Sequence, residues 1–244
     1  PGDPCPIDRE CSGTYSVEFA GSWALRTSRR EDPATEFYYG SPGDVPFSGE
    51  WDCTGERTPG LYRQSDGLVY LRNSNTQGVA DYEFFFGDPG DIPIAGDFNG
   101  DGCDTVSLYR ASEGRVYVIN RLGEDGGGLG AAELSYYFGD PGDKPFAGDF
   151  DGDGIDTIGL HRESTGLVYF RNEHSEGVAD SSFIYGDPGD QILAGDWNGD
   201  TLETVAVYRP LTGALYVKLA NTQGVADYEY SIGSYAHVVR AGQS

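Results

Sequence analysis

The stretch YYFGDPGDKPFAGDFDGDGIDTIGLHR, residues 136–162, decides the fold of this chain. It holds a DPGD turn, a short apolar run that ends in Ala-Gly-Asp at 147–149, and an acidic loop with aspartate at every second position. Short apolar runs bounded by Gly, Pro and Asp are typical of strands joined by tight turns. Related copies begin near Tyr39, Phe86 and Tyr185, so the chain is built from repeats.

A glycine before each DPGD-like turn marks the period. It falls at intervals of 47, 52, 47 and 47 residues, at Gly40, Gly87, Gly139, Gly186 and Gly233. In the second repeat we expect strands at 92–98, 106–110 and 115–120, and a fourth that ends at 136–138. Four short strands in such a period match one blade of a β-propeller. The longer interval contains GEDGGGLG, residues 123–130, which predicts a loop insertion.

The two ends of the chain complement each other. Residues 231–244 align with 137–150 and stop after a first strand, and residues 14–19, 23–28 and 36–39 predict the second, third and fourth strands. The sequence therefore predicts an all-β, five-bladed β-propeller of four-stranded blades, its ring closed by one C-terminal strand that joins three N-terminal strands. Closure removes strand edges that invite aggregation. The alternative is an open array cut from a longer chain.

We therefore expect a single propeller domain over residues 1–244. Its repeats span about 40–86, 87–138, 139–185 and 186–232, and the split blade combines 233–244 with 1–39. The chain begins at Pro1 without Met, which favours a mature or trimmed segment.

Three acidic loops share one pattern of eight positions, at 97–104, 149–156 and 196–203. Oxygen ligands at positions 1, 3 and 5 can converge on one cation, with a backbone carbonyl at position 7, and glycine at position 6 permits the turn. Ca²⁺ is favoured because Mg²⁺ demands stricter geometry. The predicted ligands are Asp97, Asn99, Asp101, Cys103, Asp104, Asp149, Asp151, Asp153, Ile155, Asp156, Asp196, Asn198, Asp200, Leu202 and Glu203.

The acidic loop after a short Ala-Gly-Asp strand, together with Phe86-Gly87 and Phe138-Gly139, resembles the FG-GAP and VCBS repeats of integrin α-subunit propellers. The resemblance covers nearly the whole chain and implies a β-propeller with Ca²⁺ between the first and second strands of a blade. The family places its last acidic ligand at position 9, whereas Asp104, Asp156 and Glu203 stand at position 8. The alternative to a metal is an Asx-type turn.

Not every repeat keeps the loop. In the fourth repeat Thr201 replaces the turn glycine, and in the first repeat Thr54 replaces a ligand. Arg57 stands at position 8 of the first loop, where its guanidinium could take the place of the cation and pair with Glu50 or Asp52. We expect no Ca²⁺ there, nor in the split blade with Gln243, and so two or three structural ions in all.

Composition and cysteines indicate a secreted or cell-surface protein. The formal net charge is −24, and so acidic a surface would repel the phosphates of nucleic acid, which we therefore do not expect as a partner. No apolar run is long enough to span a membrane. Four cysteines suit two disulfides in an oxidising compartment. Corresponding loops favour Cys53–Cys103, which leaves Cys5–Cys11, although the other two pairings stay open.

Functional residues are less clearly marked. A Tyr-Arg pair recurs late in each second strand, and a ligand pocket between blades could use its aromatic and guanidinium groups, with tyrosine packing and Arg–Asp pairing as the alternative. These candidate ligand-binding residues are Tyr62, Arg63, Tyr109, Arg110, His161, Arg162, Tyr208 and Arg209. The segments 75–81, 176–180 and 221–227 are also alike and predict a repeated contact surface on the rim of the acidic loops.

No nucleophile motif is present, so we expect no enzyme but a calcium-stabilised binding or adhesion module for carbohydrate or a surface protein. One alternative is a glycoside hydrolase with its site in the central channel, which would need two carboxyl groups in different roles. Another is a non-catalytic spacer domain of a larger secreted protein.

Overall fold

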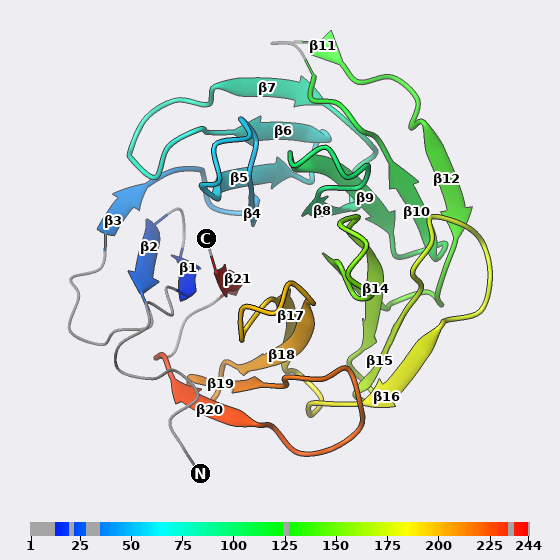
Figure 1. The fold of residues 1–244 in the computed structure, drawn as a ribbon. Coiled ribbons are helices and arrows are strands. Elements are labelled where there is room, and N and C mark those ends of the chain that lie inside the picture. The colour runs from blue at the N-terminus through cyan, green and yellow to red at the C-terminus, as the bar shows by residue number, and fades with distance from the viewer. Residues whose placement is uncertain (1–12, 20–21, 28–34, 124–126, 234–236, 244) are drawn as a thin grey trace.

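The computed structural model describes residues 13–19, 22–27, 35–123, 127–233 and 237–243. Every helix or strand within them is a β-strand, and the strands form sheets set around a central axis. Figure 1 looks down this axis, with one strand of each sheet innermost and another at the periphery. The innermost strands contact one another in a cyclic order: β4 (Val45–Gly49), β8 (Ile92–Gly96), β13 (Lys144–Gly148), β17 (Gln191–Gly195), β21 (His237–Gln243) and β4 again. This is the arrangement of a β-propeller.

Each continuous repeat supplies one sheet. The first gives β4 (Val45–Gly49), β5 (Thr58–Arg63), β6 (Leu68–Leu71) and β7 (Tyr82–Phe85). The second gives β8 (Ile92–Gly96), β9 (Thr105–Arg110), β10 (Arg115–Val118) and β12 (Leu134–Tyr137). The third gives β13 (Lys144–Gly148), β14 (Thr157–Arg162), β15 (Leu167–Phe170) and β16 (Ser181–Ile184). The fourth gives β17 (Gln191–Gly195), β18 (Thr204–Arg209), β19 (Ala214–Val217) and β20 (Tyr228–Ser231).

The two ends of the chain share the remaining sheet, in the order β21-β1-β2-β3. It consists of β21 (His237–Gln243), β1 (Gly13–Phe19), β2 (Ser22–Thr27) and β3 (Thr35–Tyr38). Strands β1 and β21 pair antiparallel from Gly13 opposite Gln243 to Glu18 opposite His237. One C-terminal strand therefore joins three N-terminal strands, as the complementary ends predict.

The predicted propeller of five four-stranded blades is wrong, because within the described residues only four of the sheets are four-stranded. The sheet of the first repeat has five strands, in the order β11-β7-β6-β5-β4. Its extra strand, β11 (Gly127–Gly128), comes from the insertion in the second repeat and pairs in parallel with β7. The sequence predicts the insertion but not its destination, since glycine-rich residues carry no pattern that specifies a partner strand.

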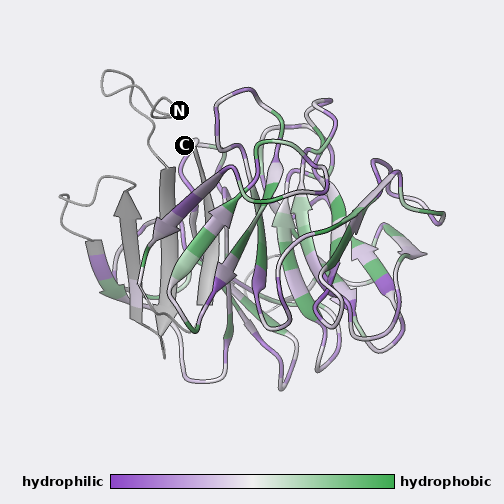
Figure 2. Ribbon diagram, turned by 90° about the horizontal axis from the view of Figure 1, so that it is seen from below, coloured by the Kyte–Doolittle hydropathy of each residue, from purple (hydrophilic) through white to green (hydrophobic). Residues whose placement is uncertain are grey.

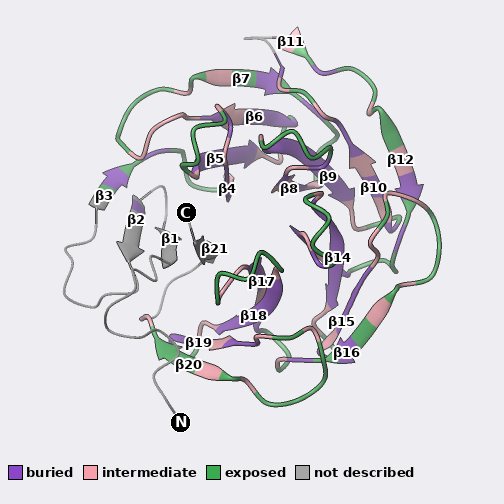
Figure 3. Ribbon diagram, viewed as in Figure 1, coloured by how far each residue is buried: buried purple, intermediate pink, exposed green. Residues whose placement is uncertain are grey.

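Burial explains the sequence of the strands. The second strand of each repeat, β5, β9, β14 or β18, is buried at every position except its terminal arginine, because neighbouring sheets cover both of its faces. The outer strands β7 and β16 each bury a single residue, Phe84 or Phe183. Figure 3 shows this gradient from the periphery inward, and Figure 2 shows that hydrophobic residues gather in the strands rather than in the loops at either end.

Candidate metal centre

The third acidic loop, 149–156, brings three carboxylates together. One oxygen each of Asp149, Asp151 and Asp153 lies within 4.8 Å of the others. Two oxygens that bind one Ca²⁺ at about 2.4 Å are at most about 4.8 Å apart, so this spacing fits a common cation. Gly152 and Gly154 have φ angles of 81° and 84°, a left-handed conformation that glycine adopts without steric cost. These two glycines let the loop turn tightly enough for the carboxylates to converge.

Backbone hydrogen bonds fix two of the three carboxylates. Asp149 accepts the N–H groups of Gly152 at 2.7 Å and Gly154 at 2.9 Å, and Asp153 accepts the N–H of Ile155 at 2.9 Å. Each carboxylate oxygen has two lone pairs, so both side chains keep sites for a cation. Asp151 makes no hydrogen bond within the described residues and is exposed. The three carboxylates therefore offer a Ca²⁺ ion anionic oxygen ligands, two of them held in place by backbone hydrogen bonds and the third exposed to solvent.

The second and fourth loops are arranged differently at position 3. The side-chain amides of Asn99 and Asn198 donate to Asp101 and Asp200, each at 2.9 Å. Asp97 meanwhile accepts backbone N–H groups from Gly100 and Gly102, both at 2.7 Å. The third loop contains the same Asx-type turn, since Asp149 accepts the corresponding N–H groups of Gly152 and Gly154. Cation binding in the second and fourth loops also requires the asparagine amide to turn its oxygen inward, so the third loop is the best of the predicted sites.

The residues at position 8 link neighbouring blades. The N–H of Asp104 donates to the Glu50 carbonyl at 2.8 Å, and its carboxylate accepts the Glu50 N–H at 3.0 Å. Asp156 makes the same pair of bonds with Asp97, at 2.7 and 3.0 Å, and the Glu203 N–H donates to Asp149 at 2.8 Å. The predicted role of Asp104 and Asp156 as last ligands of their own loops is therefore wrong. Their carboxylates face the preceding loop.

This link also explains the glycine of the Ala-Gly-Asp motif. A Cβ atom on Gly96 would lie 2.7 Å from the carboxylate of Asp156 in the next blade. Only glycine therefore leaves room for the acidic side chain.

Arg57 in the first loop does not pair with the predicted partners. Its guanidinium donates to Asp104 of the next blade at 2.7 Å, and the predicted pairing with Glu50 or Asp52 is wrong. The carboxylate of Glu50 instead accepts the N–H of Gly55, and Asp52 accepts the Thr54 hydroxyl at 2.7 Å. The first loop is thus closed by its own hydrogen bonds.

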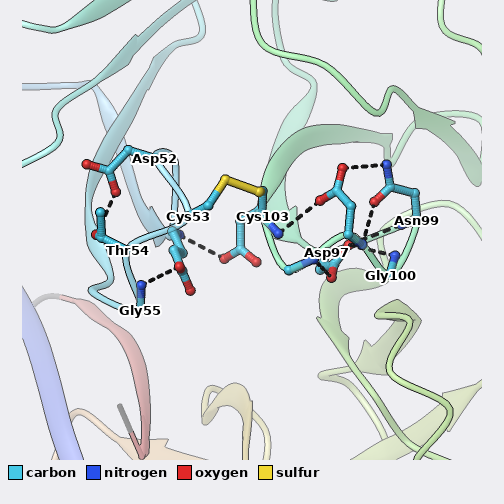
Figure 4. Close-up of a disulfide and its surroundings, with 12 residues drawn as sticks. Asp52, Cys53, Thr54, Gly55, Asp97, Asn99, Gly100 and Cys103 are labelled. Atoms are coloured by element: carbon cyan, nitrogen blue, oxygen red, sulfur yellow. Dashed lines mark hydrogen bonds between the residues drawn. A yellow bond between two sulfur atoms is a disulfide. The ribbon is translucent and has the colours of Figure 1, made fainter.

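The disulfide Cys53–Cys103 joins the first and second loops, as predicted, and is drawn in Figure 4. It connects position 4 of one loop with position 7 of the next. At the next two interfaces these positions are in contact, since a Cβ on Gly100 would lie 3.2 Å from Ile155 and one on Gly152 would lie 3.3 Å from Leu202. The disulfide is therefore the covalent form of a repeated contact. The predicted pair Cys5–Cys11 lies outside the described residues.

The Tyr-Arg positions connect turns and blades. Tyr62, Tyr109 and Tyr208 are fully buried, and the Tyr62 hydroxyl lies 3.2 Å from the Phe86 carbonyl at the end of its own repeat and 3.1 Å from the Asp88 carbonyl at the start of the next. The Tyr109 and Tyr208 hydroxyls likewise reach the carbonyls of Asp140 and Gly233.

The arginines of these pairs bind aspartates of the turn in their own blade. Arg110 donates to the buried Asp91 at 2.8 Å, and Arg63, Arg162 and Arg209 do the same with Asp44, Asp143 and Asp190. These contacts match the alternative of tyrosine packing and Arg–Asp pairing, and not a ligand pocket formed by the Tyr and Arg side chains. Arg162 also lines a groove at the junction of the second and third repeats.

Each cluster has a third member, which is not among the predicted residues. Every arginine also lies over a tyrosine of the third strand, at 4.7 to 5.7 Å from the ring centroid, a cation–π distance. These tyrosines are Tyr70, Tyr117, Tyr169 and Tyr216. Each stands seven residues after its arginine, and this constant spacing is the signal that could have identified them.

His161 replaces tyrosine in the third repeat. It is fully buried, and neither of its ring nitrogens has a well-aligned hydrogen-bond partner in the described structure, although a weak contact with the Tyr185 backbone acts against the lowering of its pKa. Burial lowers its pKa, although Glu163, Asp190 and Asp143 oppose this effect. The imidazole is therefore held neutral where the other repeats have a phenol that reaches the next blade.

The similar loops after the third strands lie on the rim of the acidic loops, as expected. The side-chain amide of Asn75 donates to the Arg57 carbonyl at 3.1 Å, and that of Asn221 donates to the Glu203 carbonyl at 2.9 Å. A basic residue, Arg72 in the first repeat, donates to the carbonyl of the loop valine. The corresponding valines are more than four-fifths exposed: Val79, Val178 and Val225.

Comparisons with known proteins name no family for this chain. No family model matches the sequence. No curated protein matches it either. The described part of the chain contains no helix that could span a membrane.

Solved structures show weak likeness over most of the chain. Two crystal structures of BBS1N in complex with ARL6DN give TM-scores of 0.46 and 0.47 at 10% and 11% identity. They cover 95% and 98% of this chain and 64% and 80% of theirs, so this chain spans less than two thirds of the first. Virginiamycin B lyase from Staphylococcus aureus gives 0.45 at 10% identity and covers 93% of this chain and 73% of its own. These likenesses carry no information on ligand or activity.

Proposed function

We propose that this propeller is a calcium-stabilised binding or adhesion module of the extracellular space, and a divergent member of the FG-GAP/VCBS repeats. The observation that carries the proposal is the convergence of Asp149, Asp151 and Asp153 within 4.8 Å. Ca²⁺ bound there would neutralise clustered carboxylates and tie the loop between β13 and β14. The role of the ion is structural, because the loop also holds the next blade through the Asp149 carbonyl.

Two further features support an extracellular location. A disulfide links neighbouring blades, and such bonds persist in oxidising compartments. Free Ca²⁺ is also abundant enough outside cells for sites of only millimolar affinity to fill.

Binding is favoured over catalysis by the equivalence of the repeats. Near-identical loops after the third strands of the first and fourth repeats present the same side chains on one rim, which suits a ligand with several similar epitopes. The ligand classes are carbohydrate and surface protein. A hydrolase would need two carboxyl groups in unlike environments. The described structure offers no observation that favours such a pair.

A binding screen tests this proposal. The protein is applied to glycan arrays and to immobilised extracellular proteins, either with about 2 mM Ca²⁺ or with EDTA. This Ca²⁺ concentration would fill a site with the millimolar dissociation constant of an extracellular module. Ca²⁺-dependent binding without turnover supports the module. Release of reducing sugar from a bound glycan would instead identify a hydrolase, and absence of any Ca²⁺ effect on binding or melting would refute the calcium-stabilised module.

A further inference from the structure

The insertion in the second repeat shows how an outer edge of this propeller binds an added strand. Gly127 and Gly128 of β11 pair in parallel with Phe84 and Phe85 of β7, and the N–H of Leu129 donates to the Phe85 carbonyl at 2.9 Å. Leu129 is only 5% exposed and belongs to the core between the first and second repeats. Figure 1 shows β11 outside β7 at the periphery. The chain thus contains its own example of strand addition with one apolar anchor.

The corresponding place one blade further on is open. A groove of about 360 Å³ lies between the end of β12 and the sheet of the third repeat. The connection from β15 to β16, residues 171–180, is five residues shorter than the connection from β10 to β12, residues 119–133. The apolar part of the lining consists of Phe138, Leu167, Tyr169, Val178 and Ala179.

The two places match residue for residue. The core cluster that contains Leu129 also contains or contacts Phe86, Tyr117 and Ala132. Superposing the marker glycines aligns the first two with Phe138 and Tyr169, and aligning the loops pairs Ala132 with Ala179. All three of these equivalents line the groove. Leu129 therefore fills, one blade earlier, the kind of space that the shorter loop leaves open.

The edge of β12 is also suited to pairing. The N–H of Phe138 donates to Gly114 within the sheet, so the preceding residue, Tyr137, turns its N–H and carbonyl to the outer side. Tyr137 corresponds to Phe85, whose carbonyl accepts the Leu129 N–H. In the described part of the chain β12 ends its sheet.

The guanidinium and phenol groups of the groove already have partners. Arg162 donates to Asp140 at 2.5 Å and to Asp143 at 2.9 Å, and the Tyr169 hydroxyl donates to Asp143. A sugar needs hydrogen-bonding groups that are free to receive it, whereas a peptide strand uses the backbone edge and an apolar pocket. The groove thus favours a peptide over a carbohydrate.

We propose that this groove binds an extended segment of a partner protein, which pairs with β12 and inserts a leucine-sized side chain between β12 and the third repeat. The inference rests on the proposed binding function and names its partner class. The segment resembles residues 127–129 in that two residues pair with the edge and the next one inserts the apolar anchor.

The probe is a fluorescein-labelled peptide with the sequence of residues 121–132, titrated into the full chain and followed by anisotropy. In the native protein the insertion already pairs with β7, so the added peptide can bind only to other outer strands such as β12. Saturable binding is expected, and a peptide with Leu129→Ala should bind at least about tenfold more weakly, because burial of a leucine is worth one to two powers of ten in affinity.

Two protein variants locate the site. Ser182 is exposed on β16 and lines the groove, and Ser182→Trp should weaken binding at least about tenfold by filling it. Glu229→Trp changes the equivalent exposed position on β20 and should leave binding unchanged. Thermal unfolding confirms that both variants fold.

Several results would overturn the proposal: no saturation, equal binding of the alanine peptide, or equal effects of the two variants. Binding of methyl glycosides that Ser182→Trp abolishes, without peptide binding, would reassign the groove to carbohydrate. If the groove binds nothing while Ca²⁺ stabilisation and array binding persist in Ser182→Trp, the binding module stands and only the groove assignment falls.

Discussion

Removal of the disulfide between the first and second loops should separate two effects that the structure combines at Cys53. The bond closes a loop with a sequence separation of 50, and Cys53 has a φ of 60°, where the other repeats have glycine. We consider two double variants. Cys53→Ser with Cys103→Ser removes only the bond, whereas Cys53→Gly with Cys103→Ile also restores the residue pair of the interface between the second and third repeats.

The expected magnitudes follow from the loop length and the backbone. Chain entropy gives about 4 kcal/mol for closing a loop of this length, by the model in which the cross-link restricts the unfolded chain. A left-handed non-glycine residue costs about 1–2 kcal/mol. For a chain of this size 1 kcal/mol corresponds to about 2–4 °C in Tm, so the serine variant should melt about 8–16 °C lower. The glycine–isoleucine variant should recover about 2–8 °C of this loss.

Scanning calorimetry without reductant measures both variants against the native protein, and a scan of the native protein with reductant serves as a control. Equal Tm values for the native protein and the serine variant would show that the disulfide does not constrain the unfolded chain. A glycine–isoleucine variant no more stable than the serine variant would refute the argument from the backbone of Cys53.

Three further changes test other parts of the structure. Thr201 has a φ of 74° where the second and third loops have glycine, so Thr201→Gly should raise the free energy of urea unfolding by about 1 kcal/mol, and a decrease would contradict this. Arg110→Ala leaves Asp91, which is 2% exposed, without its cation and should lower that free energy by about 3 kcal/mol, whereas a loss below 1 kcal/mol would mean that the pair adds little. Burial lowers the pKa of His161 below 6.5, so the unfolded chain binds its proton more readily and stability should fall as pH drops below about 6.5. Tm measured at pH 7.5 and 5.5 should change less in His161→Tyr than in the native protein, and an equal change would exclude His161 as the cause.

The sequence predicts most of the framework because each repeat copies the same constraints. The period of Gly40, Gly87 and Gly139 gives the blade, and the complementary ends give the strand that closes the ring. The destination of residues 127–128 could not be predicted, since strand addition depends on a free edge and a pocket that only the folded neighbours create.

The site shows the same division. The alternation of acidic residues predicts that Asp149, Asp151 and Asp153 converge, because it is a property of one short loop. The role of Asp156 depends on the loop of the preceding blade, which lies 59 residues earlier in sequence. The partner of Arg57 is likewise set by the next blade. Contacts between blades are thus the part that spacing within one repeat does not reveal.

The most direct test of the calcium site is a calorimetric titration of Ca²⁺ into the native protein and into Asp151→Ala. Asp151 makes no hydrogen bond within the described residues, so its removal takes away a ligand and leaves the loop intact. We predict that the native protein binds Ca²⁺ at the third loop and that Asp151→Ala, with an unchanged Tm in EDTA, loses this binding step. Identical titrations of the two proteins, or no heat of binding in either, would contradict a Ca²⁺ site at Asp149, Asp151 and Asp153.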